Sequence, residues 1–121
     1  MSDTVNPARI TDPADWWKIY PMLVKTTART DLPVNDQLAN CVMGLNGEIG
    51  EVTDIIKKHL YQGHALDKDH LAEELGDVLF YYTWLSVLIL DLDRADIIQR
   101  NFEKLKARYP EGFDPERSIN R

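Results

Sequence analysis

The stretch NDQLANCVMGLNGEIGEVTDIIKKHL, residues 35–60, decides the fold of this chain of 121 residues. Its apolar residues recur at spacings of three and four, which is the pattern of a helix with one apolar face. We therefore expect one long helix that begins near Asn35 or Asp36 and stops near Gly63. The stripe that this helix is expected to bury comprises Leu38, Cys41, Val42, Leu45, Ile49, Val52, Ile56 and Leu60.

A second long helix is expected after Asp67, because aspartate is a favourable N-cap residue. It should end at about Asp91, and the two long helices are predicted to form an antiparallel hairpin. The apolar stripe of this second helix comprises Leu71, Leu75, Val78, Leu79, Tyr82, Leu85 and Ile89.

A shorter helix is predicted on each side of this hairpin. Asp12-Pro13 is a typical helix start, Pro21 should kink or restart that helix, and the helix should fade near residue 30. Asp93 can cap the other short helix, with Asp96 completing a pattern like a capping box. That helix should end before residue 110 and bury Ile97, Ile98, Phe102 and Leu105.

No segment shows the alternation of a strand, so the predicted fold is all-α. We expect a small helical bundle of four to five helices, built on the antiparallel pair of long helices, in a single domain over residues 1–121. Its parts are a helical lead-in at 1–34, a helical core at 35–109 and an irregular tail at 110–121.

The composition excludes several classes of function. Lysine and arginine number 14 against 20 acidic residues, which gives a net charge of −6 and does not suit a nucleic-acid polymer as partner.

The longest apolar run, residues 78–90, is too short to cross a membrane, and the N-terminus lacks the pattern of a signal peptide. Cys41 is the single cysteine, which we interpret as a small buried apolar residue in a cytoplasmic protein.

Two acidic pairs, Glu48-x-x-Glu51 and Glu74-x-x-Asp77, lie on the two long helices. Residues three apart share one edge of a helix, and the flanking apolar positions place these edges near the buried side. Carboxylates that converge there repel one another, by about 4 kcal/mol for a pair at about 4 Å and an effective dielectric near 20. A hard divalent cation such as Mg²⁺, with Mn²⁺ as a substitute, is the simplest partner and makes the helical core a predicted metal-binding region.

Glycine recurs through these pairs at Gly44, Gly47, Gly50 and Gly76, where each costs a helix about 1 kcal/mol relative to alanine. Two explanations stand side by side. The glycines allow close packing of helices, or the bare backbone lets the acidic edges approach and share a cation.

The segments GEIGEV at 47–52, EELGDV at 73–78 and NFEKLKARYP at 101–110 follow one another along the chain. From about residue 38 onward, the sequence resembles the MazG family of all-α nucleoside triphosphate pyrophosphohydrolases. The resemblance implies hydrolysis of a nucleoside or deoxynucleoside triphosphate to the monophosphate and pyrophosphate, with a role in control of nucleotide pools. It also implies that Mg²⁺ is held by four acidic positions, with the general base unassigned among them: Glu48, Glu51, Glu74 and Asp77.

Cations and amides near the acidic pairs are candidates for substrate contact. The resemblance favours Asn101 and Lys104. Arg108 shares their helix face by spacing, although it can equally be a cation that stabilises the helix C-terminus. Further candidates, for which core packing or a solvated surface is the alternative, are Tyr81, Lys57, Lys58 and Asn40.

Self-association is also expected, because a helical hairpin leaves much of 78–90 uncovered in a monomer. The family resemblance implies a homodimer or a homotetramer.

Two rival functions and two residue roles stay open. A di-iron carboxylate bundle uses Glu-x-x-His motifs, whereas the second member of each pair here is Glu or Asp. A catalytically silent acidic helical interaction module has no need of two intact acidic pairs. Trp16 and Trp17 either stack on a nucleobase or cover the core. The histidines show no spacing that builds a metal site: His59, His64 and His70.

Overall fold

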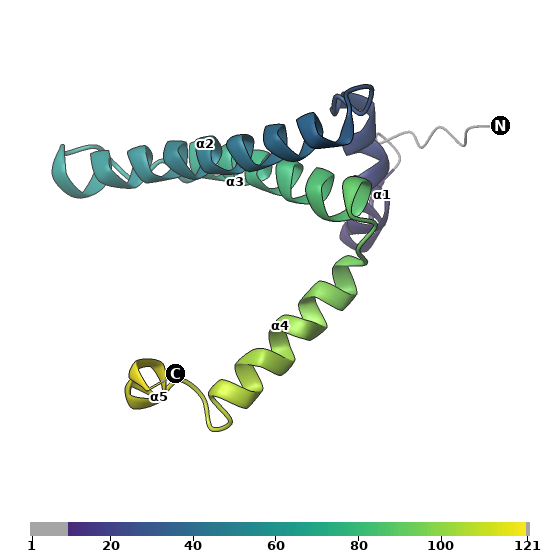
Figure 1. Cartoon of the computed structure of the whole chain (residues 1–121). Coiled ribbons are helices and arrows are strands. Elements are labelled where there is room, and N and C mark those ends of the chain that lie inside the picture. Colours follow the sequence, from purple (N-terminus) through teal and green to yellow (C-terminus); the bar gives the residue numbers. More distant parts are fainter. Residues whose placement is uncertain (1–9, 121) are drawn as a thin grey trace. The chain divides into compact units, whose positions relative to one another are not determined.

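The structure is a computed structural model that describes residues 10–120 of the chain (Figure 1). These residues form helices and turns, with no strand beyond one isolated bridge between Pro110 and Gly112, which confirms the all-α prediction. The described residues group into two compact units, which divide between Leu90 and Asp91. The boundary falls inside the range 35–109, which the sequence predicts as one core.

The first unit is built on two antiparallel helices, α2 (Val34–Tyr61) and α3 (Lys68–Thr83), which lie side by side (Figure 1). Asp67 caps α3 as predicted, because its side chain accepts a hydrogen bond of 3.0 Å from the backbone N–H of His70. Gly63 in the turn has a φ of 73°, a left-handed conformation that glycine adopts without strain. The predicted helical hairpin is therefore confirmed.

Helix α1 (Pro13–Thr27) precedes the hairpin and packs against α3 and the segment that follows it. Asp12 caps α1 as predicted, since its side chain accepts a hydrogen bond of 2.9 Å from the backbone N–H of Ala14. The proline at the first helical position needs no donor there. The helix continues through Pro21, so it does not restart there, while the alternative of a kink stays a prediction; the helix ends slightly earlier than predicted.

The second long helix does not stay α-helical to Asp91. From Trp84 to Ile89 it is a π-helix, and the N–H of Leu90 donates to the carbonyl of Leu85 over 3.1 Å. Asp91 then has a φ of 52°, which takes the chain out of the helix. The predicted α-helix is therefore wrong beyond Thr83, because an apolar pattern does not separate an α-helical turn from a wider one.

The core of the first unit lies where α1, α2 and the π-helix meet, and its buried apolar residues are Val24, Cys41 and Trp84. Burial raises the pKa of the Cys41 thiol to about 11, so this residue is the inert apolar side chain that the sequence predicts. The indole N–H of Trp84 donates a hydrogen bond of 2.9 Å to the side-chain oxygen of Gln37. The Gln37 amide donates in turn to the carbonyls of Thr30 and Leu32, at 3.2 and 2.8 Å, which ties the loop before α2 to the π-helix.

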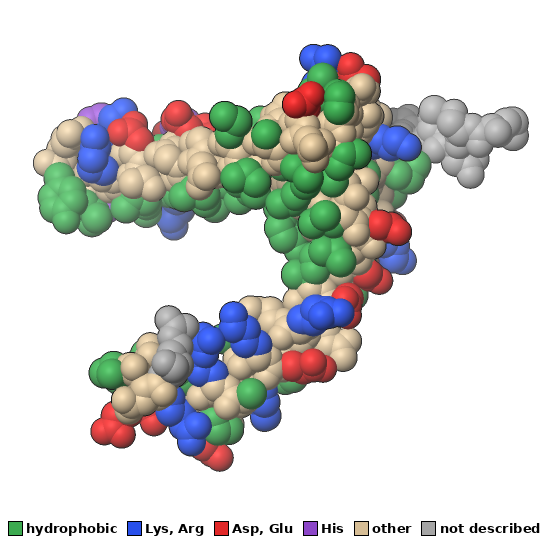
Figure 2. Space-filling view, viewed as in Figure 1, with side chains coloured by type: hydrophobic (Ala, Val, Ile, Leu, Met, Phe, Trp, Pro, Cys, Tyr) green, Lys and Arg blue, Asp and Glu red, His purple; other side chains and the backbone are tan. Residues whose placement is uncertain are grey.

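Much of the predicted apolar stripe of the hairpin is open to solvent. Val42, Ile49 and Leu60 on α2 and Leu75 on α3 are about half exposed or more. The prediction that these side chains are buried is wrong for a single copy of the chain, because a two-helix hairpin covers only one side of each helix. Figure 2 shows hydrophobic side chains gathered along one edge of this hairpin and charged side chains along the other.

The second unit consists of α4 (Arg94–Arg108) and the short helix α5 (Pro115–Ile119). Asp93 caps α4 as predicted, because its side chain accepts a hydrogen bond of 2.8 Å from a backbone N–H in the first turn of the helix. Asp96, expected to complete that cap, lies instead 2.9 Å from the guanidinium of Arg100 in an exposed ion pair.

Two predictions for this second unit are wrong. The tail is not wholly irregular, because Asp114 caps α5 and a proline occupies its first position, the same start as in α1. Ile98, Phe102 and Leu105 of α4 are exposed and Ile97 is half-buried, so the apolar face expected to be buried is largely open. The sequence pattern correctly places these residues on one face but does not say what covers it.

Within the described part of the chain, no single helix is long and apolar enough to cross a membrane. The segments 68–89 and 94–108 pass such a test only when taken together, and on length and composition alone.

Candidate functional site

Three carboxylates from the two helices of the hairpin converge on one point. Glu48 on α2 and Glu74 and Asp77 on α3 each offer one oxygen, and these oxygens lie within 4.8 Å of one another. The spacing of three residues places Glu74 and Asp77 on one edge of α3, and the antiparallel packing brings Glu48 to that edge. Glu48 and Glu74 are half-buried and Asp77 is exposed, so this acidic group lies between the helix–helix contact and solvent.

The neighbouring acids act strongly on Glu48. The pKa of its carboxyl is raised from 4.5 to about 7, first by a hydrogen bond with Glu74, then by partial burial and the charges of Asp77, Glu74 and Glu51. A proton shared between two carboxyl groups relieves their repulsion, so without a cation the folded protein holds this proton up to a higher pH than an ordinary glutamate does. A cation bound in the acidic group would replace that proton.

We expect the metal-free protein to lose stability as the pH rises from about 5 to about 7.5. The folded state holds the Glu48 proton up to a pKa of about 7, whereas an ordinary glutamate releases it near 4.5. This contribution to stability is complete below the lower pKa and is lost as the pH rises through the higher one. Thermal unfolding in EDTA should show a steeper fall in melting temperature for the wild type than for Glu48→Gln, which stays neutral. Parallel curves for the two proteins would assign the titration to another group.

Glu51, the fourth predicted carboxylate, lies one turn after Glu48 and outside the group of three. It is exposed, but its charge contributes to the raised pKa of Glu48. The structure thus brings three of the four predicted carboxylates together and leaves the fourth on the rim. Glu51 also lines a hollow of about 260 Å³ near the turn of the hairpin, together with Asp54, Ile55, Lys58, His64, Ala65, Asp67 and His70.

Three of the four glycines do not serve the approach of the acidic edges. A Cβ atom built at Gly47, Gly50 or Gly76 would meet nothing within 4 Å beyond its own helix backbone and chain neighbours. Within a single copy of the chain, neither close packing nor a bare backbone between the acids therefore accounts for glycine at these positions.

Gly44 is the position where close approach occurs. A Cβ atom there would overlap the aromatic ring of Tyr81, one helical turn after Asp77. The Tyr81 ring also stacks on Trp84, with centroids 6.3 Å apart and an interplanar angle of 20°. Tyr81, a candidate for substrate contact, is thus held by packing against α2 and the π-helix.

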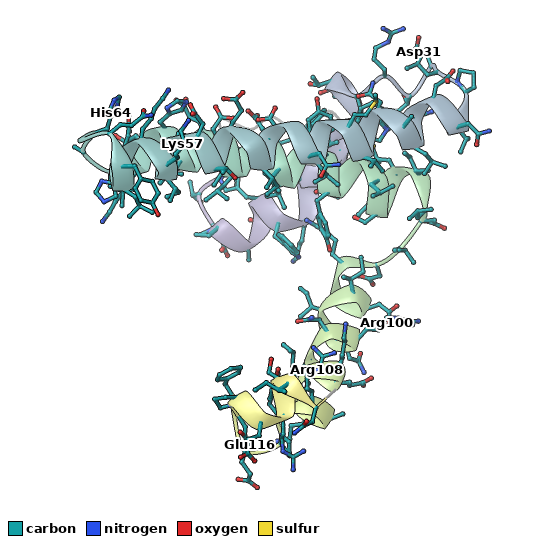
Figure 3. All side chains as sticks on the ribbon, turned by 60° about the vertical axis from the view of Figure 1, so that its left-hand side comes forward. Asp31, Lys57, His64, Arg100, Arg108 and Glu116 are labelled. Atoms are coloured by element: carbon teal, nitrogen blue, oxygen red, sulfur yellow. The ribbon has the colours of Figure 1, made fainter. Side chains whose placement is uncertain are left out.

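The other candidates in the first unit lie on α2. Lys57 lies near the turn of the hairpin (Figure 3), where its Nζ is 3.5 Å from Asp54 and that of Lys58 is 2.8 Å from the same carboxylate. These contacts are the exposed ion pairs of a solvated surface. Asn40 is half-buried, about two turns before Glu48.

The two tryptophans of α1 are partly exposed, and their predicted role in covering the core stays a prediction. Trp16 and Trp17 are each 43% exposed, whereas Tyr20 and Val24 of the same helix pack in the core cluster. Stacking of either tryptophan on a nucleobase stays a prediction.

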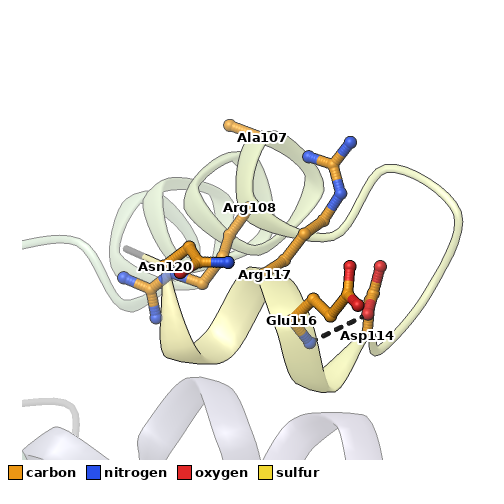
Figure 4. A pocket seen from close by; sticks show the side chains of 6 residues that line it. All are labelled: Ala107, Arg108, Asp114, Glu116, Arg117 and Asn120. Carbon is orange, nitrogen blue, oxygen red and sulfur yellow. Dashed lines mark hydrogen bonds between the residues drawn. The ribbon is translucent and has the colours of Figure 1, made fainter.

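Asn101, Lys104 and Arg108 belong to the second unit, where the first two are exposed on α4 and Arg108 is half-buried. Figure 4 shows the guanidinium of Arg108 beside Asn120, while the guanidinium of Arg117 points to another side of the same hollow. Substrate contact by the three α4 residues stays a prediction. The hollow, of about 480 Å³, is lined by Ala107, Arg108, Asp114, Glu116, Arg117 and Asn120.

Two residues near the acidic group are absent from the set predicted from the sequence. The pKa of Tyr20 on α1 is raised by burial and by the charge of Asp77, so its hydroxyl lies within electrostatic range of that carboxylate. His70 places its Nε2 atom 3.2 Å from Oε1 of Glu74. The spacing of four residues between His70 and Glu74 is a signal in the sequence, whereas only tertiary packing brings Tyr20 near.

A helical hairpin with three convergent carboxylates is a site suited to a divalent cation, and comparison with known proteins agrees with this class. The chain belongs to the MazG family, because the model of the MazG nucleotide pyrophosphohydrolase domain matches residues 37–113. A relative is the Gene 37 protein of Mycobacterium phage L5, 37% identical over 79 residues, which are 62% of this chain and 68% of the phage protein. No solved structure gives a significant match.

Proposed function

We propose that this protein hydrolyses nucleoside or deoxynucleoside triphosphates to the monophosphate and pyrophosphate in a Mg²⁺-dependent reaction that serves control of nucleotide pools. The observation that carries the proposal is the approach of Glu48, Glu74 and Asp77 within 4.8 Å of one another in a chain of the MazG family. An acidic surface accepts a polyphosphate poorly unless a cation stands between them.

The donor set supports Mg²⁺ as the cation. Carboxylate oxygens are the ligands that hard divalent cations prefer, and Mn²⁺ accepts the same ligands. Glu48, Glu74 and Asp77 each offer one such oxygen, and these atoms lie within 4.8 Å of one another, so the three side chains could hold one ion.

We propose separate roles for the carboxylates and for the other candidate residues. Glu48, Glu74 and Asp77 would hold the ion, with Glu51 on the rim as the fourth ligand. When bound, the ion supplies Lewis-acid polarisation of the phosphoryl oxygens and lowers the pKa of a water molecule. One of the four carboxylates accepts the proton of the attacking water. Side chains proposed to bind the substrate are Asn101, Lys104, Arg108, Tyr81, Lys57 and Asn40.

The direct test is an incubation of the protein with a panel of canonical and modified nucleotides in Mg²⁺, with the products identified by chromatography. The expected products are the nucleoside monophosphate and pyrophosphate, in equal amounts, with no turnover in EDTA. Release of single orthophosphate would assign a different reaction. Absence of turnover with every nucleotide would favour a catalytically silent interaction module.

We also propose that the protein acts in the cytoplasm as a homodimer or a homotetramer. The exposed apolar side chains of α2, α3 and α4 support self-association, since a monomer rarely leaves so much apolar surface in contact with water. Light scattering at micromolar protein concentration should give at least twice the chain mass of 14.0 kDa. The mass of a single chain would contradict self-association without bearing on the reaction.

A further inference from the structure

His70 is the potentially cationic side chain that contacts the acidic group. Its Nε2 atom lies 3.2 Å from Oε1 of Glu74, at the distance of an ion pair or a charge-assisted hydrogen bond. Among the ion pairs recorded for residues 10–120, this is the only one that involves Glu48, Glu74 or Asp77. The imidazole can donate from Nε2 both in one neutral tautomer and in the protonated form.

The backbone holds His70 in position independently of Glu74. The side chain of Asp67 accepts a hydrogen bond of 3.0 Å from the backbone N–H of His70. The backbone carbonyl of Asp67 accepts another, also of 3.0 Å, from the backbone N–H of Leu71. The first turn of α3 is therefore fixed by its cap. The spacing of four residues then places the imidazole over the Glu74 carboxylate on one helix face.

We propose that His70 is a positioning residue that fixes the orientation of the Glu74 carboxylate for cation binding. This inference rests on the function proposed above. Contact with a donor at Oε1 limits rotation of the Glu74 carboxylate. The same contact offsets part of the repulsion that Glu74 receives from Glu48 and Asp77.

The burial of the two side chains supports the proposal that His70 positions Glu74. The Glu74 side chain is 16% exposed, whereas that of His70 is 48% exposed. The carboxylate is thus the more buried partner of this contact, and the imidazole is the more exposed one. Hydrogen-bonding partners of this kind orient metal-ligating carboxylates, and their removal typically weakens metal binding 10- to 100-fold.

The test is a titration of the full-length, metal-free protein with Mn²⁺ alone, followed by isothermal calorimetry or by the loss of the free-ion paramagnetic resonance signal. His70→Phe keeps a ring of similar size but has no donor, and we expect it to bind Mn²⁺ about 10-fold more weakly or worse. His70→Gln carries an amide N–H near the position of Nε2 and should restore binding to within about 3-fold of wild type. The matched control is His64→Phe, which changes a histidine of the neighbouring hollow that has no recorded contact with the three carboxylates.

The outcomes separate the two proposals. Equal affinity for Mn²⁺ in the wild type and in His70→Phe would overturn the role of His70 and leave the proposed hydrolysis standing. Weak binding in both His70→Phe and His70→Gln, with native helical circular dichroism, would also overturn it, since the donor would not be what matters. A wild type that binds no Mn²⁺ at millimolar concentration would contradict the proposed function itself.

Discussion

Asp77→Asn is expected to lower nucleotide hydrolysis about 100-fold or more while the protein remains folded. Asp77 is the exposed member of the three convergent carboxylates, so its oxygen is the one most open to an arriving cation and its nucleotide. An amide in its place removes a charge that stabilises the cation, and a cation contributes several kcal/mol to phosphoryl transfer. Each 1.36 kcal/mol of lost stabilisation is tenfold in rate. Steady-state hydrolysis at saturating Mg²⁺ measures the loss.

The same substitution should act on stability in the opposite direction. Without a cation, Asp77 repels Glu48, whose pKa its charge helps to raise. Asp77→Asn removes that repulsion, so its melting temperature in EDTA should equal or exceed that of the wild type. Mg²⁺ should then raise the melting temperature of the wild type but not that of the variant, because only binding to the folded state stabilises it.

Glu73→Gln is the matched control for Asp77→Asn. Glu73 is an exposed acid on the same helix, outside the group of three, and loses the same charge. It should keep nearly full activity and its stabilisation by Mg²⁺. Full activity in Asp77→Asn would show that this carboxylate is not part of the site. Equal losses of activity in both variants would show that the effect comes from the change in net charge.

The sequence predicts the helices well because their ends depend on local chemistry. Asp12, Asp67 and Asp93 each accept a backbone hydrogen bond at the start of a helix, as their positions before apolar repeats predict. Asp114 does the same in a segment predicted to be irregular, because five residues are too few for an apolar repeat to show. A helix cap can thus be predicted from a single residue, whereas an apolar repeat can be recognised only over several helical turns.

Burial is the property that the sequence predicts least well. Ile49 and Phe102 stand on apolar helix faces, yet both are exposed in a single copy of the chain. Periodicity identifies the face that avoids water but not the surface that covers it. Trp84 shows the converse, since it is buried and its hydrogen bond to Gln37 joins residues that are 47 positions apart in the sequence.

The candidate site was predictable to the extent that it depends on spacing. Glu74 and Asp77 share a helix edge by their separation of three, and the hairpin brings Glu48 to them. Glu51 obeys the same spacing rule relative to Glu48 but lies outside the group. Which member of an i, i+3 pair turns inward depends on the rotation of the whole helix, and the sequence pattern does not fix that rotation to within one residue.

Gly44→Ala and Gly47→Ala are expected to change stability in opposite directions. Alanine in place of glycine favours a helix by about 1 kcal/mol. At Gly47 the new methyl group meets nothing within 4 Å beyond its own helix, so this gain should appear in full. At Gly44 the methyl group overlaps the ring of Tyr81, and overpacking of this kind costs about 1–3 kcal/mol. Urea unfolding should therefore place Gly44→Ala about 1–3 kcal/mol below Gly47→Ala in free energy of unfolding.

A second background shows whether the Tyr81 ring is the cause. The ring could swing away from α2 only by leaving its stack on Trp84 and its edge contact with Phe80, whose centroid is 5.2 Å away. Such aromatic pairs contribute about 0.5–1.5 kcal/mol each, so the movement is not free. In a Tyr81→Leu background the overlap disappears, and Gly44→Ala should become stabilising, like Gly47→Ala. If Gly44→Ala already stabilises the otherwise wild-type protein, the Tyr81 ring moves aside at little cost. The contact between Gly44 and Tyr81 would then not be what holds α3 against α2 beside the acidic group.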